Sequence, residues 1–211
     1  MYLSDRDLAH AIRRNHLIVE PPPAKIDPTS IDLRLDGPGQ AKVWDIARLK
    51  DTNEIMGAGE VELRLGKFQY GKFAEKYLIA PPEEADDPEI RVFRRGRSVL
   101  VRPGGFLLWT TKEIVGTPSD GARLICFVDG KSTRARTGIV VHMTAPTIHG
   151  GWAGKITLEI GNFGPFTFVL EEDDVIAQLI VAQLSSVPDV TQEAAGSATQ
   201  GQADVTGAAA V

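Results

Sequence analysis

Cysteine is nearly absent from this chain of 211 residues, which contains only Cys126. One cysteine cannot form an intrachain disulfide, and it cannot by itself build a cysteine-based zinc cluster. Long hydrophobic runs are missing as well, since no stretch approaches the roughly 18 apolar residues that a membrane helix needs. Residues 1–5 lack the basic region and apolar block of a secretory signal. We therefore expect a soluble, cytoplasmic protein that does not contact a membrane.

Positive charge is also scarce. The chain has 23 basic and 28 acidic residues, for a net charge of −5, and no Lys or Arg follows Lys155. Proteins that bind nucleic acid obtain most of their affinity from basic surface, so nucleic acid is not an expected partner. Hydrophobic residues make up 43% of the chain, which is enough for a core, and the 21 glycines and 13 prolines suit short strands and many turns.

The pattern predicts a mainly β protein with a short N-terminal helix. Ser4 can cap a helix that has Asp5 and Asp7 in its first turn, and alternation over residues 31–35 predicts a strand. From Val99 onward, short apolar runs are separated by turn residues, which favours an all-β barrel or a jelly roll. These runs are residues 99–101, 106–109, 124–128, 138–144, 155–160, 167–170 and 175–184.

Composition divides the chain into one domain and a tail. Residues 1–185 form the expected single domain, in which 40–98 is a charged surface excursion or insertion with strands near 61–65 and 90–93. Beyond that domain the chain is rich in Ser, Ala, Gly, Gln and Thr, with only scattered apolar residues. This composition predicts a flexible C-terminal tail over residues 186–211, either a disordered end or a flap that orders on ligand.

Residues 129–138, Asp-Gly-Lys-Ser-Thr-Arg-Ala-Arg-Thr-Gly, concentrate groups that bind anions. The segment follows an apolar strand, Ser132 or Thr133 can cap one helical turn, and three cations lie in or beside that turn. Free backbone N–H groups next to cations form an anion cradle. A strand-to-helix connection with solvated basic side chains explains the same residues, and the local pattern alone favours this second interpretation.

A second segment, residues 142–160, ends in a strand that carries a carboxylate. Ile156, Leu158 and Ile160 share one face of this strand, so Glu159 lies mid-strand on the opposite face. Glu159 is therefore either an ordinary exposed carboxylate or a functional group. The strand pattern alone favours the former.

Six motifs occur in a fixed order along the chain. They are Pro-Thr-Ser-Ile-Asp-Leu-Arg-Leu (28–35), Arg-Pro-Gly-Gly-Phe-Leu-Leu (102–108), the anion-binding segment 129–138, His-Met-Thr-Ala (142–145), Gly-Gly-Trp-Ala-Gly-Lys-Ile-Thr-Leu-Glu (150–159) and Val-Ile-Ala-Gln-Leu (175–179). In this order they resemble dCTP deaminase, the metal-independent branch of the dUTPase-like trimeric fold. The resemblance covers roughly residues 1–36 and 99–184. It implies a distorted jelly-roll, dUTPase-like β-barrel that forms a homotrimer with active sites between subunits.

The resemblance also implies roles for individual side chains. Glu159 would take a proton from a bound water, Ser132 would orient that water, and Arg136 would keep the carboxylate ionised and help to hold the ligand. The substrate-binding residues that it implies are Lys131, Ser132, Thr133, Arg134, Ala135, Arg136, His149, Thr157, Leu158, Glu159, Gln178 and Gln202. Trp152 would form a wall of the pocket, although packing inside the barrel explains this tryptophan equally well. Gln178 is also open to interpretation as a strand residue that faces solvent.

Three positions depart from the pattern of the family. Lys131 replaces an expected arginine, which keeps the charge but loses the bidentate fork. His149 stands where the family usually has an acidic residue that helps to hold the sugar. The segment Gly-Ser-Ala-Thr-Gln-Gly-Gln (196–202) resembles the closing motif Gly-Lys-Tyr-Gln-Gly-Gln without its lysine and tyrosine. Phosphate charge must then be met by the cations of residues 131–136, by Mg²⁺ or by the arginines of 94–97.

Together these features predict the hydrolytic deamination of dCTP to dUTP and ammonia. Zinc deaminases carry an H-x-E…P-C-x-x-C signature, but none of the four histidines here is followed two residues later by Glu. We therefore expect no zinc. The resemblance implies Mg²⁺ only as an ion bound through the substrate triphosphate. The alternatives are a bifunctional enzyme that gives dUMP and a non-catalytic nucleotide-binding trimer. A pure dUTPase is disfavoured because the tail after residue 185 contains no aromatic residue to stack on uracil.

Overall fold

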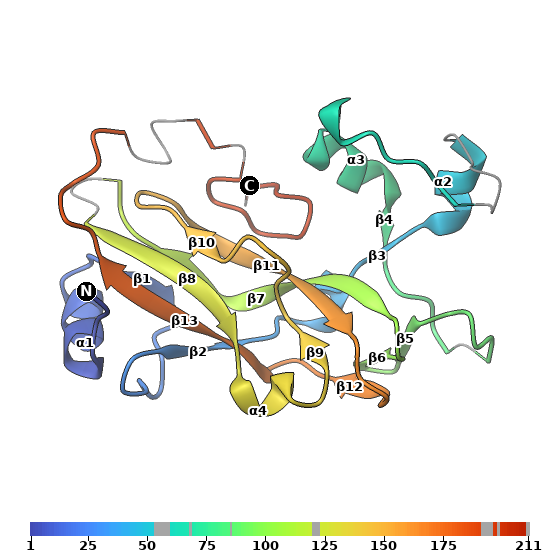
Figure 1. Cartoon of the computed structure of the whole chain (residues 1–211), viewed down its shortest axis with the longest axis horizontal. Helices are drawn as coiled ribbons and strands as arrows, with labels where there is room; N and C mark the ends of the chain where they lie inside the picture. Colours follow the sequence, from blue (N-terminus) through green and yellow to red (C-terminus); the bar gives the residue numbers. More distant parts are fainter. Residues whose placement is uncertain are drawn as a thin grey trace.

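The structure, a computed structural model, describes residues 1–52, 60–67, 69–84, 86–119, 123–190, 196–197 and 199–209. The helices are α1 (Asp5–Arg13), α2 (Ile46–Thr52), α3 (Tyr70–Tyr77) and α4 (Ser132–Ala135), with 3₁₀ turns η1 (Pro38–Gln40) and η2 (Leu65–Lys67). The strands are β1 (Ile18–Glu20), β2 (Ile31–Arg34), β3 (Val43–Trp44), β4 (Leu78–Ile79), β5 (Val92–Arg95), β6 (Ser98–Val101), β7 (Phe106–Gly116), β8 (Leu124–Gly130), β9 (Ile139–Val140), β10 (Thr147–Ile148), β11 (Ala153–Asn162), β12 (Phe168–Leu170) and β13 (Val175–Gln183). Figure 1 shows their arrangement.

Two four-stranded sheets enclose the core. One has the order β1-β7-β11-β9 and the other has the order β10-β8-β13-β2. Trp109 and Leu158 of the first sheet and Leu33 and Leu179 of the second are fully buried in one hydrophobic cluster, so the two sheets share a core. Smaller sheets, β12-β6-β5 and β3-β4, complete the strands that the structure describes, and no closed barrel is detected among them. The predicted mainly β class is confirmed.

Helix α1 confirms the predicted N-terminal helix. Ser4 and Asp7 form a capping box at its start, and the Ser4 hydroxyl donates to Asp7 Oδ2 at 3.0 Å. Leu8 and Ala11 are buried, because they lie one turn apart on the face that meets the core. No helix within the described ranges is long and apolar enough to span a membrane.

The pairing of β7 with β11 is interrupted by a bulge. Lys155 pairs with Ile114, but Thr157 pairs with Thr110, so residues 111–113 of β7 stand opposite a single residue of β11. The Ile156 amide donates to Thr111 Oγ1 at 2.9 Å, which replaces the missing backbone partner. The bulge lies in the half of β11 that leads to Glu159.

The region 40–98 contains helices that the sequence did not predict. A strand near 61–65 is wrong: residues 65–67 form η2, and Leu63 and Leu65 are exposed. The alternation of apolar and polar residues over 61–65 suits a strand. In the described structure, however, the apolar side chains of Leu63 and Leu65 do not cover a sheet. The strand expected near 90–93 is present as β5, shifted by two residues. Helix α2 lies beyond the ends of the main sheets, whereas α3 lies above the end of β7 and β11 (Figure 1).

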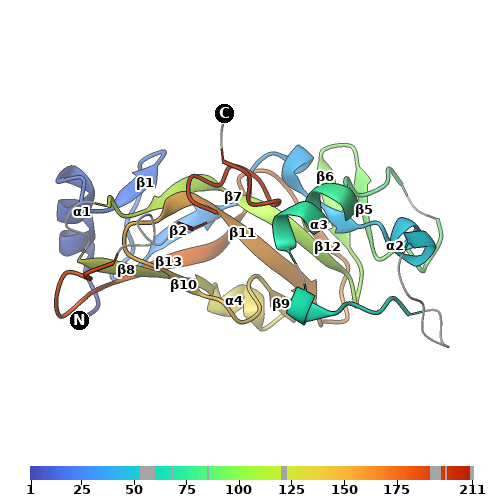
Figure 2. The same ribbon diagram turned by 90° about the horizontal axis from the view of Figure 1, so that it is seen from above.

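The described part of the C-terminal tail folds back onto β11. The Gly201 amide donates to the Ala153 carbonyl at 2.9 Å, and the Lys155 amide donates to the Gln202 carbonyl at 2.8 Å. This pairing uses the edge of β11 that β9 leaves free, because β9 pairs only with residues 161 and 162. Val205 is fully buried. We call residues 199–209 the closing segment, which Figure 2 shows between β11 and α3.

Candidate active site

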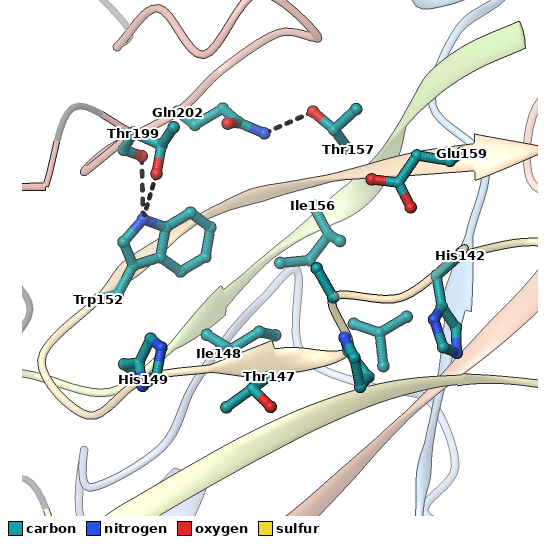
Figure 3. Close-up of a pocket in the computed structure, with 13 residues that line it drawn as sticks. His142, Thr147, Ile148, His149, Trp152, Ile156, Thr157, Glu159, Thr199 and Gln202 are labelled. Carbon is teal, nitrogen blue, oxygen red and sulfur yellow. Dashed lines mark hydrogen bonds between the residues drawn. The ribbon is translucent and has the colours of Figure 1, made fainter. Parts of the chain in front are cut away.

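A cavity of about 310 Å³ lies beside β10 and β11, under the closing segment (Figure 3). Its wall combines residues of the strands β8, β10 and β11, the loops on either side of β10 and the closing segment. The lining residues are Val128, His142, Ala145, Pro146, Thr147, Ile148, His149, Trp152, Ile156, Thr157, Glu159, Thr199 and Gln202. The volume falls in the range of small-molecule sites.

Glu159 supplies the only carboxylate of this lining. Leu158 and Ile160 on either side of it are fully buried, so the alternation of the strand places Glu159 on the other face, where it is half-buried. The Met143 amide donates to Glu159 Oε2 at 3.1 Å. A neutral backbone donor therefore orients the carboxylate without neutralising its charge.

The closing segment is bonded to the cavity wall at two points. Trp152 is almost fully buried, and its Nε1 donates to the Thr199 carbonyl at 3.0 Å and to Thr199 Oγ1 at 3.2 Å. Gln202 Nε2 donates to Thr157 Oγ1 at 2.7 Å and to the Lys155 carbonyl at 3.0 Å. Trp152 thus both forms a wall of the cavity and packs in the core, which combines the two interpretations of this residue.

Two histidines line the cavity. His142 Nε2 lies 3.7 Å from Asp129 Oδ1, and its Nδ1 is buried with no hydrogen-bond partner among the described residues. His149 is exposed at the rim. Sequence reasoning named His149 as a site residue but not His142, although His142 begins the motif His-Met-Thr-Ala. The place of His142 within that motif is the sequence feature that could have marked it as a site residue.

The segment 129–138 contains one helical turn, as predicted, but this turn is capped differently. Lys131 is the N-cap residue and Ser132 begins α4, so neither Ser132 nor Thr133 caps the helix. The Lys131 ammonium group forms an ion pair with Asp32 and lies 3.6 Å from Asp27 Oδ2. Two carboxylates that sequence reasoning did not include thus offset the charge of Lys131.

Most of the predicted site residues fall into two groups within one chain. His149, Thr157, Glu159 and Gln202 meet at the cavity. The second group lies on residues 131–138, which contain α4 and which we call the α4 loop. In this loop Arg134 is half-buried, and the exposed residues are Ser132, Thr133, Ala135 and Arg136. None of these loop residues lines the cavity that holds Glu159.

Gln178 and Leu158 take different positions from the cavity group. Gln178 Nε2 donates to the Gly130 carbonyl at 3.1 Å, which places this side chain beside the α4 loop. The Leu158 side chain is buried in the core, so only its backbone can face a ligand.

Helix α3 brings Tyr70, which sequence reasoning did not include, against the closing segment that lies over the cavity. The Tyr70 hydroxyl donates to the Val205 carbonyl of the closing segment. Burial, together with the smaller effect of the negative charges of Glu159 and Asp204, raises the pKa of Tyr70 to about 12.

In the part of the chain that the structure describes, no three His, Cys, Asp or Glu side chains are grouped as metal ligands. Cys126 is fully buried in the core, and burial raises the pKa of its thiol to about 12.

The fold is similar to a solved structure with a named activity. That structure is 2'-deoxycytidine 5'-triphosphate deaminase from Agrobacterium tumefaciens, which is 16% identical, with a TM-score of 0.52. The likeness covers 85% of this chain and 47% of that chain, so this chain spans about half the length of the solved one. At this identity the likeness shows a shared fold.

Sequence comparison carries the assignment further. Residues 2–184 match the model of the family described as dCTP deaminase-like. The dCTP deaminase of Haloarcula marismortui is 32% identical over 96% of this chain and 91% of its own length. An enzyme named "dCTP deaminase, dUMP-forming" from Dictyoglomus thermophilum is 31% identical, over 88% of this chain and 82% of its own length. The chain belongs to the dCTP deaminase family and is an enzyme of the hydrolase class, which confirms the resemblance inferred from its motifs.

Proposed function

We propose that this protein hydrolyses dCTP to dUTP and ammonia in pyrimidine deoxynucleotide metabolism. The observation that carries the proposal is the Glu159 carboxylate, held by the Met143 amide at 3.1 Å inside a cavity of about 310 Å³. Membership of the dCTP deaminase family supports the choice of substrate. A carboxylate oriented in this way can serve as a general base and then as a general acid.

The reaction needs one water and one group that moves protons. Glu159 takes a proton from water as the oxygen adds to C4 of the cytosine ring, and it delivers that proton to ring N3. The tetrahedral adduct then loses a proton from its new hydroxyl to Glu159, which passes it to the exocyclic nitrogen. The C4–N bond breaks, ammonia leaves, and the oxygen remains as the carbonyl of uracil. One dCTP and one water thus give one dUTP and one ammonia.

The other two catalytic residues are proposed to come from a neighbouring subunit of a homotrimer. Ser132 and Arg136 are exposed on the α4 loop, and they do not line the cavity of their own chain. A head-to-tail ring of three chains can present each loop to the cavity of the next chain. In that arrangement Ser132 orients the water, and the Arg136 guanidinium stabilises the ionised form of Glu159.

The α4 loop is also the proposed contact for the triphosphate. Because Asp27 and Asp32 offset the charge of Lys131, we assign most of the phosphate binding to Arg134 and Arg136. The nucleotide is expected as its Mg²⁺ complex, in which the ion belongs to the substrate and neutralises part of the phosphate charge.

A second candidate is the bifunctional reaction that ends at dUMP. The relatives from Dictyoglomus thermophilum and Salinispora arenicola are both named dUMP-forming. In this reaction a second water attacks the α-phosphorus of the nucleotide and pyrophosphate leaves.

One assay separates the candidates: purified protein is incubated with dCTP and Mg²⁺ while ammonia, dUTP, dUMP and pyrophosphate are followed together. Ammonia with dUTP supports the first reaction, and ammonia with dUMP and pyrophosphate supports the second. Binding of dCTP without ammonia contradicts both and favours a non-catalytic nucleotide-binding trimer.

Replacing the base tests the mechanism. Glu159→Gln keeps the shape of the side chain and leaves an oxygen for the Met143 amide, but it removes the proton acceptor. We expect kcat to fall by roughly 100-fold or more, with secondary structure and assembly size unchanged. Glu89→Gln, a change at an exposed carboxylate outside the cavity, is the matched control and should keep full activity. A Glu159→Gln variant that turns over at the normal rate would show that another group is the base.

A further inference from the structure

Helix α3 and the closing segment contact each other directly. The Tyr70 hydroxyl donates to the Val205 carbonyl, and Val205 is fully buried. A Cβ built on Gly71 would lie 3.7 Å from the Thr206 carbonyl oxygen, which is ordinary packing distance. Figure 2 shows α3 beside the closing segment. The region 40–98, which the motifs of the family do not cover, therefore reaches the active-site side of the molecule.

The turn between these contacts and the cavity is tight. The Ala203 amide donates to the Ala208 carbonyl at 2.7 Å, and Asp204 Oδ1 accepts from the Thr206 amide at 2.8 Å and its hydroxyl at 2.6 Å. Gln202 at the start of the turn donates to Thr157 in the cavity wall. Because the turn is braced internally, a displacement at Val205 moves Gln202 as well.

We propose that Tyr70 is a positioning residue of the active site: by holding Val205 it keeps Gln202 and Thr199 over the cavity where the nucleotide binds. The inference rests on the proposed function, since dCTP is the ligand whose binding it affects. The closing segment has no lysine, arginine or aromatic side chain of its own. Besides its backbone pairing with β11, the segment is held at the cavity by side-chain hydrogen bonds from Gln202 and from Trp152 to Thr199, and the Tyr70 hydroxyl adds an anchor from α3.

The protonation of Tyr70 suits this role. The hydroxyl can donate to Val205 only while it keeps its proton, and its pKa is raised from 10.0 to about 12. A pKa that is higher in the folded state means that the contribution to stability is complete below pH 10 and is lost as the pH rises toward 12. At the pH of ordinary assays the bond is therefore formed.

Tyr70→Phe tests the proposal because it removes only the hydroxyl and keeps the ring. Loss of one hydrogen bond should shift the balance between closed and open segment by roughly five-fold. In the nucleotide-free protein we expect hydrogen exchange at the Gly201 and Lys155 amides to accelerate by about that factor. With dCTP, KM should rise by a similar factor while kcat changes less than about two-fold.

Tyr77→Phe is the matched control. It makes the same chemical change on the same helix, but the Tyr77 hydroxyl bonds to Thr52 Oγ1 rather than to the closing segment. Exchange at Gly201 and Lys155 should stay at the wild-type rate. Equal acceleration in both tyrosine variants, or none in Tyr70→Phe, would overturn the proposal.

A Gln202→Ala protein tests whether Tyr70 positions the closing segment or only stabilises α3. If Tyr70 acts through Gln202, Tyr70→Phe should raise KM less in a Gln202→Ala protein than in the wild type. If the double variant raises KM by the product of the two single-variant factors, Tyr70 does not act through Gln202. The exchange measurement needs no turnover, so a protein that fails to deaminate dCTP yet shows faster exchange in Tyr70→Phe would refute the proposed function and leave the contact intact.

Discussion

A carboxylate inside β7 is the least expected single-residue feature. Glu113 is only 3% exposed, and it accepts from the Arg34 amide at 2.9 Å and from Arg34 Nε at 2.7 Å. The hydrogen bond to Glu113 raises the pKa of Arg34 above its ordinary value, so the guanidinium stays charged. Glu113 lies in the bulge opposite Ile156, so the pair that it forms with Arg34 supports β11 at this point.

Removing Arg34 should therefore cost more stability than removing an exposed arginine. Arg34→Met leaves the buried Glu113 without its charged partner, and we expect the free energy of unfolding to fall by roughly 2–4 kcal/mol in urea titrations. Arg97→Met is the control, because Arg97 is 84% exposed and its ion pair with Glu172 contributes little. If the two variants unfold at the same urea concentration, the buried pair does not stabilise the fold.

For single residues, the sequence predicts which face of a strand a side chain occupies better than it predicts which distant side chain it pairs with. The alternation of Leu158, Glu159 and Ile160 placed the carboxylate on the correct face of its strand, because strand periodicity is a local property. The pairing of Lys131 with Asp32 could not be predicted in the same way. It joins residues 99 positions apart and depends on β8 and β2 flanking β13, which no local pattern specifies.

Among the elements, the α4 loop is held in place by the turn between β11 and β12. The Phe163 amide donates to the Gly138 carbonyl at 2.8 Å. A Cβ built on Gly164 would lie only 1.9 Å from the Thr137 carbonyl oxygen, a separation that no side chain can have. Glycine at 164 therefore lets the loop that carries Ser132 and Arg136 pack against the end of β11.

Gly164→Ala should displace this loop. Because catalytic groups tolerate little misplacement, we expect kcat/KM for dCTP to fall by roughly 10- to 100-fold. Gly37→Ala is the control, since nothing lies within 4 Å of its added methyl group and its backbone angles suit alanine. Steady-state measurements of kcat/KM for dCTP on the two variants compare their effects. Normal kcat/KM in a folded Gly164→Ala protein would mean that the position of the loop does not matter to the reaction.

Elements with strong local signals were predictable, and those that depend on distant packing were not. The capping box of α1 and the apolar runs of β7, β11 and β13 are signals of the first kind. The alternation near 61–65 resembles a strand, but a strand in a sheet usually buries one face, and Leu63 and Leu65 are exposed. The closing segment is low in apolar residues, yet it pairs with β11, because β11 offers it a free edge.

Assembly is the property of the whole molecule on which the proposed mechanism depends. If each site combines Glu159 of one chain with Arg136 of the next, two inactive variants should restore activity together. Random assembly of equal amounts of Glu159→Gln and Arg136→Ala chains makes about three quarters of the trimers mixed, each with one intact site of three. We therefore expect about a quarter of wild-type activity after the two proteins are unfolded and refolded as a mixture.

The two proteins refolded separately and then combined without exchange are the control. They should show no more than the sum of their residual activities. Failure of the refolded mixture to recover activity, with trimers present by light scattering, would show that Glu159 and Arg136 do not act across a subunit boundary.

The pairing of the closing segment with β11 also bears on solubility. When the segment leaves, the Ala153 carbonyl and the Lys155 amide lose their partners, and a free strand edge is open to water. Such an edge is a template for a strand from another molecule, and stacking of edges is a route to aggregation. By occupying that edge, the closing segment removes a template for such pairing, and this effect does not require bound nucleotide.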